Sequence, residues 1–251
     1  MKFIYLFSLL LVLQGQQVQA QLSISPNQTA TFLANKLVAT SGTLGVTVSN
    51  AVLTCDSNGN GTFSGSTNLS ISDGIVLGTG DVLSNSATST FGLNGHAGDF
   101  ASASFGTAGD TQLGNVIGAT TYDACVLEMD LQPVGSFMEF EYIFGSEEYP
   151  SFNCTPFNDV FAFFISGPGI SVPQNIALLP GTNVPVSINS INDSTSTSGT
   201  PCAISSSLYV PNTDTFTTMN GFTQSLTAHI NVTPGSVYHL KLAIADVMGE
   251  A

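Results

Sequence analysis

The sequence predicts an all-β protein, built as a two-sheet antiparallel β-sandwich of jelly-roll-like type with long loops rich in Gly, Ser and Asn. Three observations favour this class. Several short segments alternate apolar and polar residues, and turns containing Gly or Pro separate them. No long segment repeats apolar residues at helical spacing. Only 8% of the residues are charged, so hydroxyl and amide groups are expected to solubilise the surface.

The amino terminus has the features of a signal peptide. Lys2 precedes an apolar stretch at residues 3–13 that is too short to span a bilayer, and the small residues at 18–20 fit a cleavage site. A leader over residues 1–20 and one secreted β-sandwich domain over residues 21–251 are therefore expected. No later stretch of the sequence is apolar for long enough to cross a membrane.

The balance of charge restricts the partners. The chain has 17 Asp and Glu residues but only three Lys and no Arg, and its formal net charge is −14. Nucleic acids and anionic membrane surfaces are bound through Lys and Arg, so both are poor partners. A cation is a better ligand, and an extracellular or cell-surface protein or glycan is the expected macromolecular partner.

The predicted strands follow one another at short intervals along the chain. They are expected at residues 47–53, 74–80, 125–131, 137–144, 160–165, 176–179, 184–191, 226–232 and 237–245. Turns or loops are expected at residues 56–65, 84–118 and 192–200, where Gly, Ser and Asn are frequent.

Two of these strands enclose an acidic loop, which is the first candidate site. Residues 137–144 alternate apolar and polar side chains, and residues 160–165 are apolar on both faces, so both strands are predicted to lie in the core. Calcium takes about six to eight oxygen ligands from carboxylates, amides and carbonyls. The loop and the end of the last strand therefore predict a calcium site formed by Glu147, Glu148, Asn158, Asp159 and Asp246. The alternative is that these are solvated turn residues.

A second oxygen-rich turn lies at residues 56–61. It matches the opening of the D-x-[DN]-x-[DN]-G calcium loop, but the twelfth position is Thr67, where a bidentate Glu belongs. The Asn-Gly pairs in this turn are also typical of an ordinary hairpin. A calcium loop and a plain turn are both compatible with the sequence.

The four cysteines predict up to two disulfides, because the chain is expected to be exported. They are Cys55, Cys125, Cys154 and Cys202. No two of them form a CxxC pair, which argues against a zinc site built from thiolates. Three connectivities are possible and the sequence does not choose between them. We expect Cys55–Cys125 and Cys154–Cys202, with four free thiols as the alternative.

Two pairs of carboxylates suggest a glycoside hydrolase as an alternative. Glu128 and Asp130 resemble the E-x-D-x-x-E strand of laminarinase-like enzymes, but Pro133 stands where the third carboxylate belongs. Glu139 and Glu141 share one strand face at roughly 7 Å, a separation that suits a carboxylate pair. The chain has no Trp to stack on a sugar ring and no G-x-S-x-G motif. No catalytic residue is therefore assigned.

The chain resembles the choice-of-anchor L domain family in six strings that occur in the family's order. They are DGIVLGTG, YDACVLEMDL, YIFGSEEYPSF, FNDVFAFFISGPG, NIALLPGTNVPVSIN and YHLKLAIAD. Together they span roughly residues 50–246, nearly the whole mature chain. The SEEYP segment of the family corresponds to residues 146–150, the FNDVF segment to residues 157–161, and the IAD segment to residues 244–246.

The resemblance implies an exported β-sandwich module of bacterial surface proteins, found especially in Bacteroidota. Members are anchored to the cell or released through varied C-terminal sorting signals, including those of type IX secretion. They usually continue past the IAD segment with a further strand, linkers and a sorting domain. Here the sequence stops at Ala251, so we expect the C-terminal strand and the sorting region to be missing.

The expected function is therefore that of a secreted, non-catalytic cell-surface module for adhesion or extracellular assembly, stabilised by calcium. A calcium-dependent carbohydrate-binding domain is the alternative among binding proteins. A glycoside hydrolase is the alternative among enzymes.

Overall fold

The structure is a computed structural model that describes residues 23–40, 45–65, 69–83, 104–193, 202, 204–213 and 219–247. The predicted signal peptide lies outside the described residues, as do residues 248–251 and parts of the predicted loops, residues 84–103 and 194–200. Within the described residues, no helix is long and apolar enough to cross a membrane.

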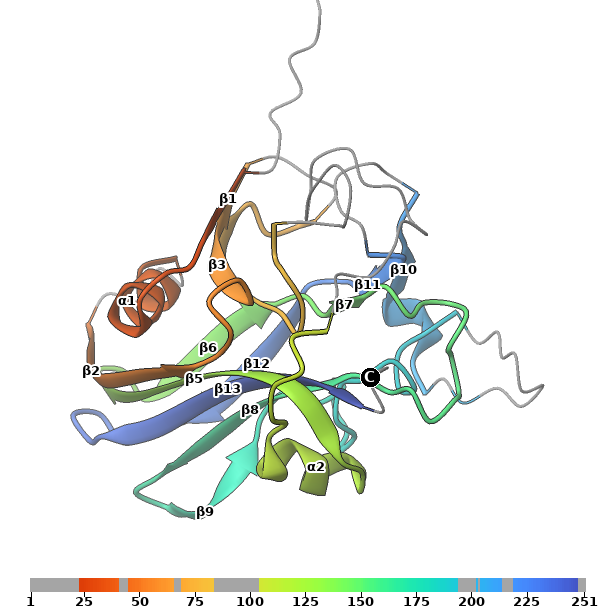
Figure 1. Cartoon of the computed structure of the whole chain (residues 1–251). Coiled ribbons are helices and arrows are strands. Elements are labelled where there is room, and N and C mark those ends of the chain that lie inside the picture. The colour runs from red at the N-terminus through yellow and green to blue at the C-terminus, as the bar shows by residue number, and fades with distance from the viewer. Residues whose placement is uncertain are drawn as a thin grey trace, which may run out of the picture.

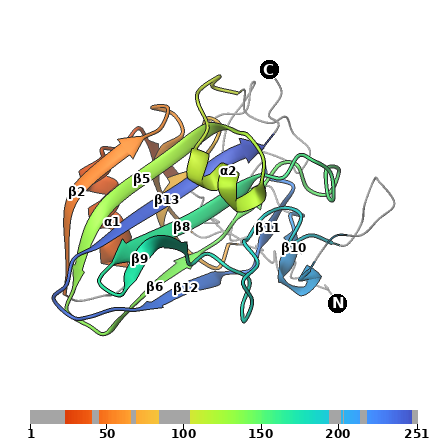
Figure 2. The same ribbon diagram turned by 90° about the horizontal axis from the view of Figure 1, so that it is seen from below.

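A five-stranded antiparallel sheet forms the main layer (Figures 1 and 2). Its order is β2 (Val46–Thr54), β5 (Thr121–Pro133), β13 (Tyr238–Val247), β8 (Val160–Gly167) and β9 (Ile170–Asn175). The central strand β13 pairs with β5 on one side and with β8 on the other. Alternating sequences predicted β5 and β13, and the run of apolar residues predicted β8, which is buried along most of its length.

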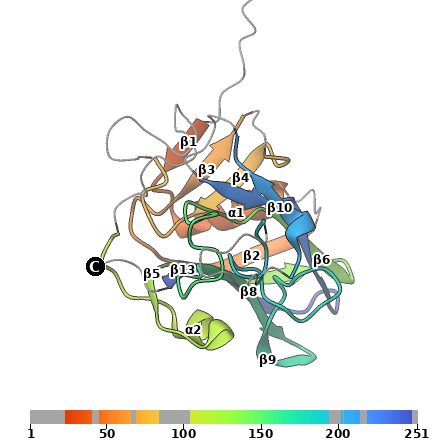
Figure 3. The same ribbon diagram turned by 90° about the vertical axis from the view of Figure 1, so that its right-hand side faces the viewer.

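The second layer is divided into smaller sheets. β6 (Phe137–Tyr142) pairs with β12 (Leu226–Asn231) over six residues without a break in register. β7 (Gly145–Ser146), β11 (Gly221–Thr223) and β10 (Tyr209–Pro211) form a short sheet, and β1 (Ser23–Pro26), β3 (Asn60–Ser64) and β4 (Asp73–Leu77) form another. Figure 3 shows the β1–β3–β4 sheet on the opposite side of the main sheet from α2. The all-β sandwich class is confirmed.

The main core lies between the two layers. Alternate residues of β6, namely Met138, Phe140 and Tyr142, are buried against residues of the five-stranded sheet. The ring of Tyr142 lies 4.9 Å from that of Phe161 and 5.1 Å from that of Phe163, both edge to face. Such aromatic pairs add stability beyond the burial of their area.

Two helices and one 3₁₀ turn, none of them expected from the sequence, complete the fold. α1 (Ala30–Thr40) packs against β2 and β4 and buries Leu33 and Ala34. α2 (Thr111–Ile117) covers part of the other face of the main sheet, and the Asp110 carboxylate accepts a hydrogen bond from the Leu113 backbone N–H at its N-terminus. The 3₁₀ turn is η1 (Ser206–Leu208).

Several strand predictions are wrong. Residues 176–179 and 184–191 form only isolated bridges, because the chain turns at Ser187, whose carbonyl accepts bonds from Ser190 and Ile191. The predicted turn at residues 56–65 contains β3, and β1, β7, β9, β10 and β11 were not predicted.

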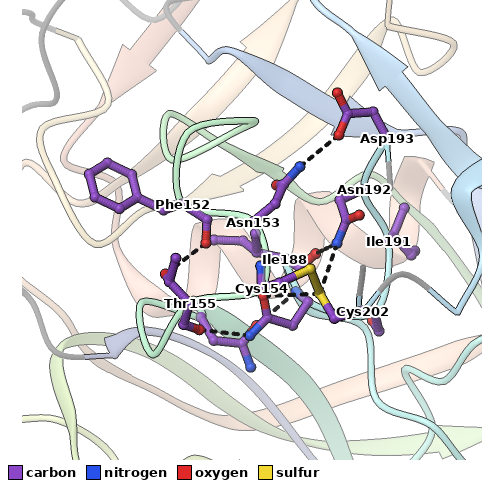
Figure 4. Close-up of a disulfide and its surroundings, with 12 residues drawn as sticks. Phe152, Asn153, Cys154, Thr155, Ile188, Ile191, Asn192, Asp193 and Cys202 are labelled. Atoms are coloured by element: carbon purple, nitrogen blue, oxygen red, sulfur yellow. Dashed lines mark hydrogen bonds between the residues drawn. A yellow bond between two sulfur atoms is a disulfide. The ribbon is translucent and has the colours of Figure 1, made fainter. Parts of the chain in front are cut away.

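Both predicted disulfides are confirmed. Cys55 is bonded to Cys125, and Cys154 is bonded to Cys202. The second bridge joins the loop before β8 to a later loop (Figure 4). Beside it, the buried Asn153 side chain donates a 2.8 Å hydrogen bond to Asp193. The bridge therefore belongs to a polar network that fixes the loop leading into Asp159.

Candidate cation site

Three of the predicted ligands come together at one end of the sandwich. Glu148 follows β7, Asp159 directly precedes β8, and Asp246 lies near the end of β13. The pairing of β13 with β8 places Ala245 opposite Val160, so their neighbours Asp246 and Asp159 are close in space. The charges of Glu148 and Asp246 both act on Asp159. We call these three residues the carboxylate cluster.

Hydrogen bonds position each member of the carboxylate cluster. The Ser146 hydroxyl donates to Asp159 Oδ2 at 3.2 Å and accepts from the Glu148 backbone N–H at 3.0 Å. Asp159 also accepts a bond from the Val247 backbone N–H, and its own N–H donates to Glu148. The hydroxyl of Thr79, from the loop after β4, donates to Asp246. Groups from four separate segments therefore hold the cluster.

Burial and mutual repulsion raise the pKa of all three carboxyl groups. Burial, and then the charge of Asp246, raise the pKa of Glu148 from 4.5 to about 7. Burial, and then the charge of nearby Asp123, raise the pKa of Asp246 from 3.8 to about 6. Burial, followed by the charges of its two partners, raises the pKa of Asp159 well above its usual value. The ionised cluster is therefore unfavourable unless a cation offsets its charge.

The described lysines do not supply that cation. Lys36 Nζ lies 2.7 Å from Asp73 Oδ2, and Lys241 Nζ lies 2.6 Å from Asp110 Oδ2. Both are therefore engaged in ion pairs away from the cluster. The only other lysine of the sequence, Lys2, belongs to the predicted leader.

The cluster has spare oxygen acceptors but no finished coordination shell. Among the described residues, Glu148 Oε2 and Asn220 Oδ1 are buried without a hydrogen-bond partner. Asn220 lies beside the cluster, since its backbone N–H donates to the Ser146 carbonyl. In the described part of the chain, no group of three or more His, Cys, Asp or Glu is arranged to hold a metal ion. The three carboxylates are thus coupled electrostatically, and a bound ion would have to draw them closer.

The other two predicted ligands, Asn158 and Glu147, make hydrogen bonds to loop residues. Asn158 Oδ1 accepts a 2.9 Å hydrogen bond from the Asn189 backbone N–H and so fixes a loop. The backbone carbonyl of Glu147 accepts a hydrogen bond from Asn220. Neither residue is among those whose charge or hydrogen bonds shift the pKa of the carboxylate cluster.

Two residues near the cluster were not singled out from the sequence. Thr79 lies in the DGIVLGTG string, where a hydroxyl in a Gly-rich turn gave a weak signal. Asp123 is buried at a positive φ of 48° in β5. Burial opposes its ionisation, but hydrogen bonds, first from Ser104 and then from Thr107, outweigh it and lower the pKa of Asp123. Asp123 therefore adds a lasting negative charge near Asp246.

The second oxygen-rich turn is occupied by its own hydrogen bonds. Asp56 Oδ1 accepts from the Asn58 backbone N–H at 3.0 Å. Asn60 Oδ1 accepts from the Gln28 backbone N–H at 2.8 Å, and its Nδ2 donates to the Asp56 and Ser57 carbonyls. These bonds account for Asp56 as a turn residue and for Asn60 as the residue that holds this turn at the start of β3.

The first hydrolase pair lies on the outward face of the main sheet. His239 Nδ1 is 2.9 Å from Asp130 Oδ1, and its Nε2 is 3.4 Å from Glu128 Oε1. Asn50 also donates to Asp130 at 2.7 Å. Both carboxylates are therefore engaged with surface neighbours.

The second hydrolase pair lies on the outward face of β6. Glu139 Oε1 is 3.0 Å from His229 Nδ1, and Glu141 accepts a 2.6 Å hydrogen bond from the Ser225 hydroxyl. Phe137 stacks on His229 with 5.6 Å between the ring centroids. These carboxylates form an exposed row in contact with β12.

Four of the strings that carry the family resemblance meet at the carboxylate cluster. DGIVLGTG supplies Thr79, SEEYP supplies Glu148, FNDVF supplies Asp159 and IAD supplies Asp246. Residues that are distant in sequence thus form one site, and the fold places the shared motifs together.

Comparison with known proteins gives one match. A family model described as Choice-of-anchor L domain matches residues 21–251. No curated protein and no solved structure matches the chain.

Proposed function

Because the chain belongs to the choice-of-anchor L domain family, we propose that it is a secreted, surface-associated, non-catalytic module that acts in adhesion or extracellular assembly. The family match over residues 21–251 carries this proposal. The two disulfides support it, because disulfides persist mainly in proteins outside the reducing cytosol.

Labelling of intact cells tests the surface location. An antibody against the sandwich domain is expected to label the producing cells without permeabilisation. Protease added to the intact cells is expected to remove the signal. Labelling that appears only after permeabilisation would contradict the proposal, and an internal cytosolic protein serves as the control for intact cells.

For the carboxylate cluster, we propose calcium as the ligand. Three observations support this: the raised pKa of all three carboxyl groups, the engagement of the described lysines elsewhere, and the two buried oxygens without partners. Calcium accepts irregular sets of oxygen ligands, including amides, carbonyls and water. A bound ion would join the loop after β7 to the start of β8 and the end of β13, and so stabilise that end of the sandwich.

Thermal unfolding with and without calcium tests this assignment. Calcium at about 100 times its dissociation constant is expected to stabilise the native state by about 2.7 kcal/mol relative to chelator. Asp159→Asn is expected to abolish this gain, whereas Glu139→Gln on the exposed face should retain it. Magnesium should be less effective, because it requires regular octahedral coordination. An unchanged melting temperature at millimolar calcium, or an equal gain in Asp159→Asn, would refute the site.

A further inference from the structure

The exposed strand edges of the molecule differ in how well they are protected. A bare edge presents unpaired backbone groups to other chains, and proline or a break in register blocks such pairing. β9 contains Pro173, β10 contains Pro211 and β1 contains Pro26. β2 has a register shift between Ser49 and Val52. Four edge strands thus carry a recognised device against association.

β12 has none of these devices. In the described part of the chain it pairs only with β6, and no strand lies beyond it at the rim of the molecule in Figure 2. Its sequence, LTAHIN, contains no proline, lysine or acidic residue, and its six pairs with β6 run without a register shift. A straight, uncharged edge of this kind is suited to pairing with another strand.

The alternation of hydrogen bonds between β6 and β12 shows which residues of β12 direct their backbone groups away from β6. The Val232 N–H donates to the Ser136 carbonyl at 2.9 Å, in register with the β6–β12 ladder. In an antiparallel pair, bonded residues alternate. Leu226, Ala228 and Ile230 therefore bond to β6, whereas Thr227, His229 and Asn231 direct their backbone N–H and C=O groups away from it.

We propose that β12 pairs with β12 of a second copy of this chain, antiparallel and centred on His229. This register sets Thr227 opposite the second copy's Asn231, on both sides of the axis. The three pairs would each exchange two backbone hydrogen bonds. The two second layers would then form one continuous sheet, with β6 on the outside in each copy.

Charge selects β12 over the free edge of β6. Pairing β6 with a second β6 around Glu139 would set like charges directly opposite, which destabilises a sheet. The β12 edge is uncharged apart from the ionisable His229, whose ring contacts its own Glu139 at 3.0 Å. Because each copy has a formal net charge of −14, an uncharged contact strip lets two copies approach once salt screens the remaining charges.

The expected association is weak. A six-residue edge is smaller than a typical stable interface, so a dissociation constant on the order of 0.1 mM is expected. Weak pairing becomes effective where copies are held together at a surface, because their effective concentration is high. This inference deepens the proposed assembly role and rests on it for its biological setting, but it is independent of the calcium site.

Sedimentation velocity of the oxidised, secreted domain tests the pairing, from about 10 μM to about 1 mM at about 150 mM salt. The wild-type protein is expected to form dimers as its concentration rises. Thr227→Pro removes an outward N–H without affecting the bonds to β6, and should weaken dimerisation at least tenfold. Thr227→Ala keeps that N–H and should dimerise like wild type. His229→Lys keeps the contact with Glu139 but opposes two charges at the axis, and should remain monomeric.

Hydrogen exchange gives a second readout that does not depend on the variants. At high protein concentration, the amides of Thr227, His229 and Asn231 should become protected, while exposed amides elsewhere do not change. A protein that is monomeric up to about 1 mM, or that dimerises equally as Thr227→Pro, would overturn the proposal. Calcium-dependent stability would still be intact in that case, so failure of the dimer is distinguishable from failure of the calcium site.

Discussion

Replacing Glu148 by Gln should make the protein more stable at alkaline pH in the absence of calcium. Burial, and then the charge of Asp246, raise the pKa of Glu148 from 4.5 to about 7 in the folded protein. The carboxyl group thus favours the folded state below about pH 4.5, and that advantage is lost as the pH rises through 7. Each unit of pKa corresponds to about 1.4 kcal/mol, so ionisation of Glu148 costs on the order of 3 kcal/mol by about pH 8.

Gln has the same shape and no charge, and its amide oxygen can still accept the bond from the Asp159 N–H. In chelator, Glu148→Gln should therefore exceed wild type by on the order of 3 kcal/mol at about pH 8 and by less than about 1 kcal/mol at about pH 5. The same variant should lose stabilisation by calcium, because it lacks a charged ligand.

Urea unfolding of the oxidised protein at both pH values measures these differences. Glu139→Gln removes an exposed carboxylate and is the matched control, for which a change within about 0.5 kcal/mol is expected. A Glu148→Gln variant that is less stable than wild type at both pH values, or that differs from it by the same amount at both, would refute the electrostatic account of the cluster.

Two further predictions concern parts of the fold away from the cluster. Replacing both Cys154 and Cys202 by Ala opens a loop of 48 residues and should lower the free energy of unfolding by about 4 kcal/mol. Urea unfolding measures this loss. A loss under about 1 kcal/mol would mean that the network in Figure 4 holds the loop without the bridge. Asp110→Ala removes both the N-terminal cap of α2 and the partner of the largely buried Lys241, and should lower the free energy of unfolding by about 3 kcal/mol. Asp110→Asn keeps a capping oxygen and should lower it by less. Equal losses in the two variants would show that the cap contributes nothing measurable.

The sequence was most informative where strands carry their own periodic pattern. β6, β12 and β13 alternate clearly, and the apolar run of β8 marks a strand covered on both faces, so these elements were predicted close to their observed bounds. β5 was also predicted, but it begins at Thr121, four residues before the predicted start. Two of them, β8 and β13, lie next to or contain Asp159 and Asp246, so both residues could be placed at strand ends from the sequence.

The elements that were not predicted lack such a pattern, or carry one that neighbouring residues obscure. α1 keeps the half-exposed Phe32 beside the buried Leu33 and Ala34, which blurs its apolar stripe. Its start was nevertheless readable, since Thr29 accepts a hydrogen bond from Phe32 in the manner of a helix cap. Residues 184–191 are apolar and buried, yet the Ser187 turn keeps them out of a ladder. Burial alone therefore did not identify a strand.

Long-range placement explains the rest of the site. Thr79 and Asp246 are far apart in the sequence, and only the finished fold brings the loop after β4 to the end of β13. The engagement of Lys241 away from the cluster was likewise hidden, because nothing in the local sequence shows that Asp110 holds it.

The position of β13 also has a consequence for the order of folding. It is the last of the five strands of the main sheet in chain order, yet it occupies the centre and bonds to β5 and β8 on either side. Until residues 238–247 have been synthesised, those two strands have no neighbour between them. The main sheet therefore cannot close until the last of its strands is available to the rest of the chain.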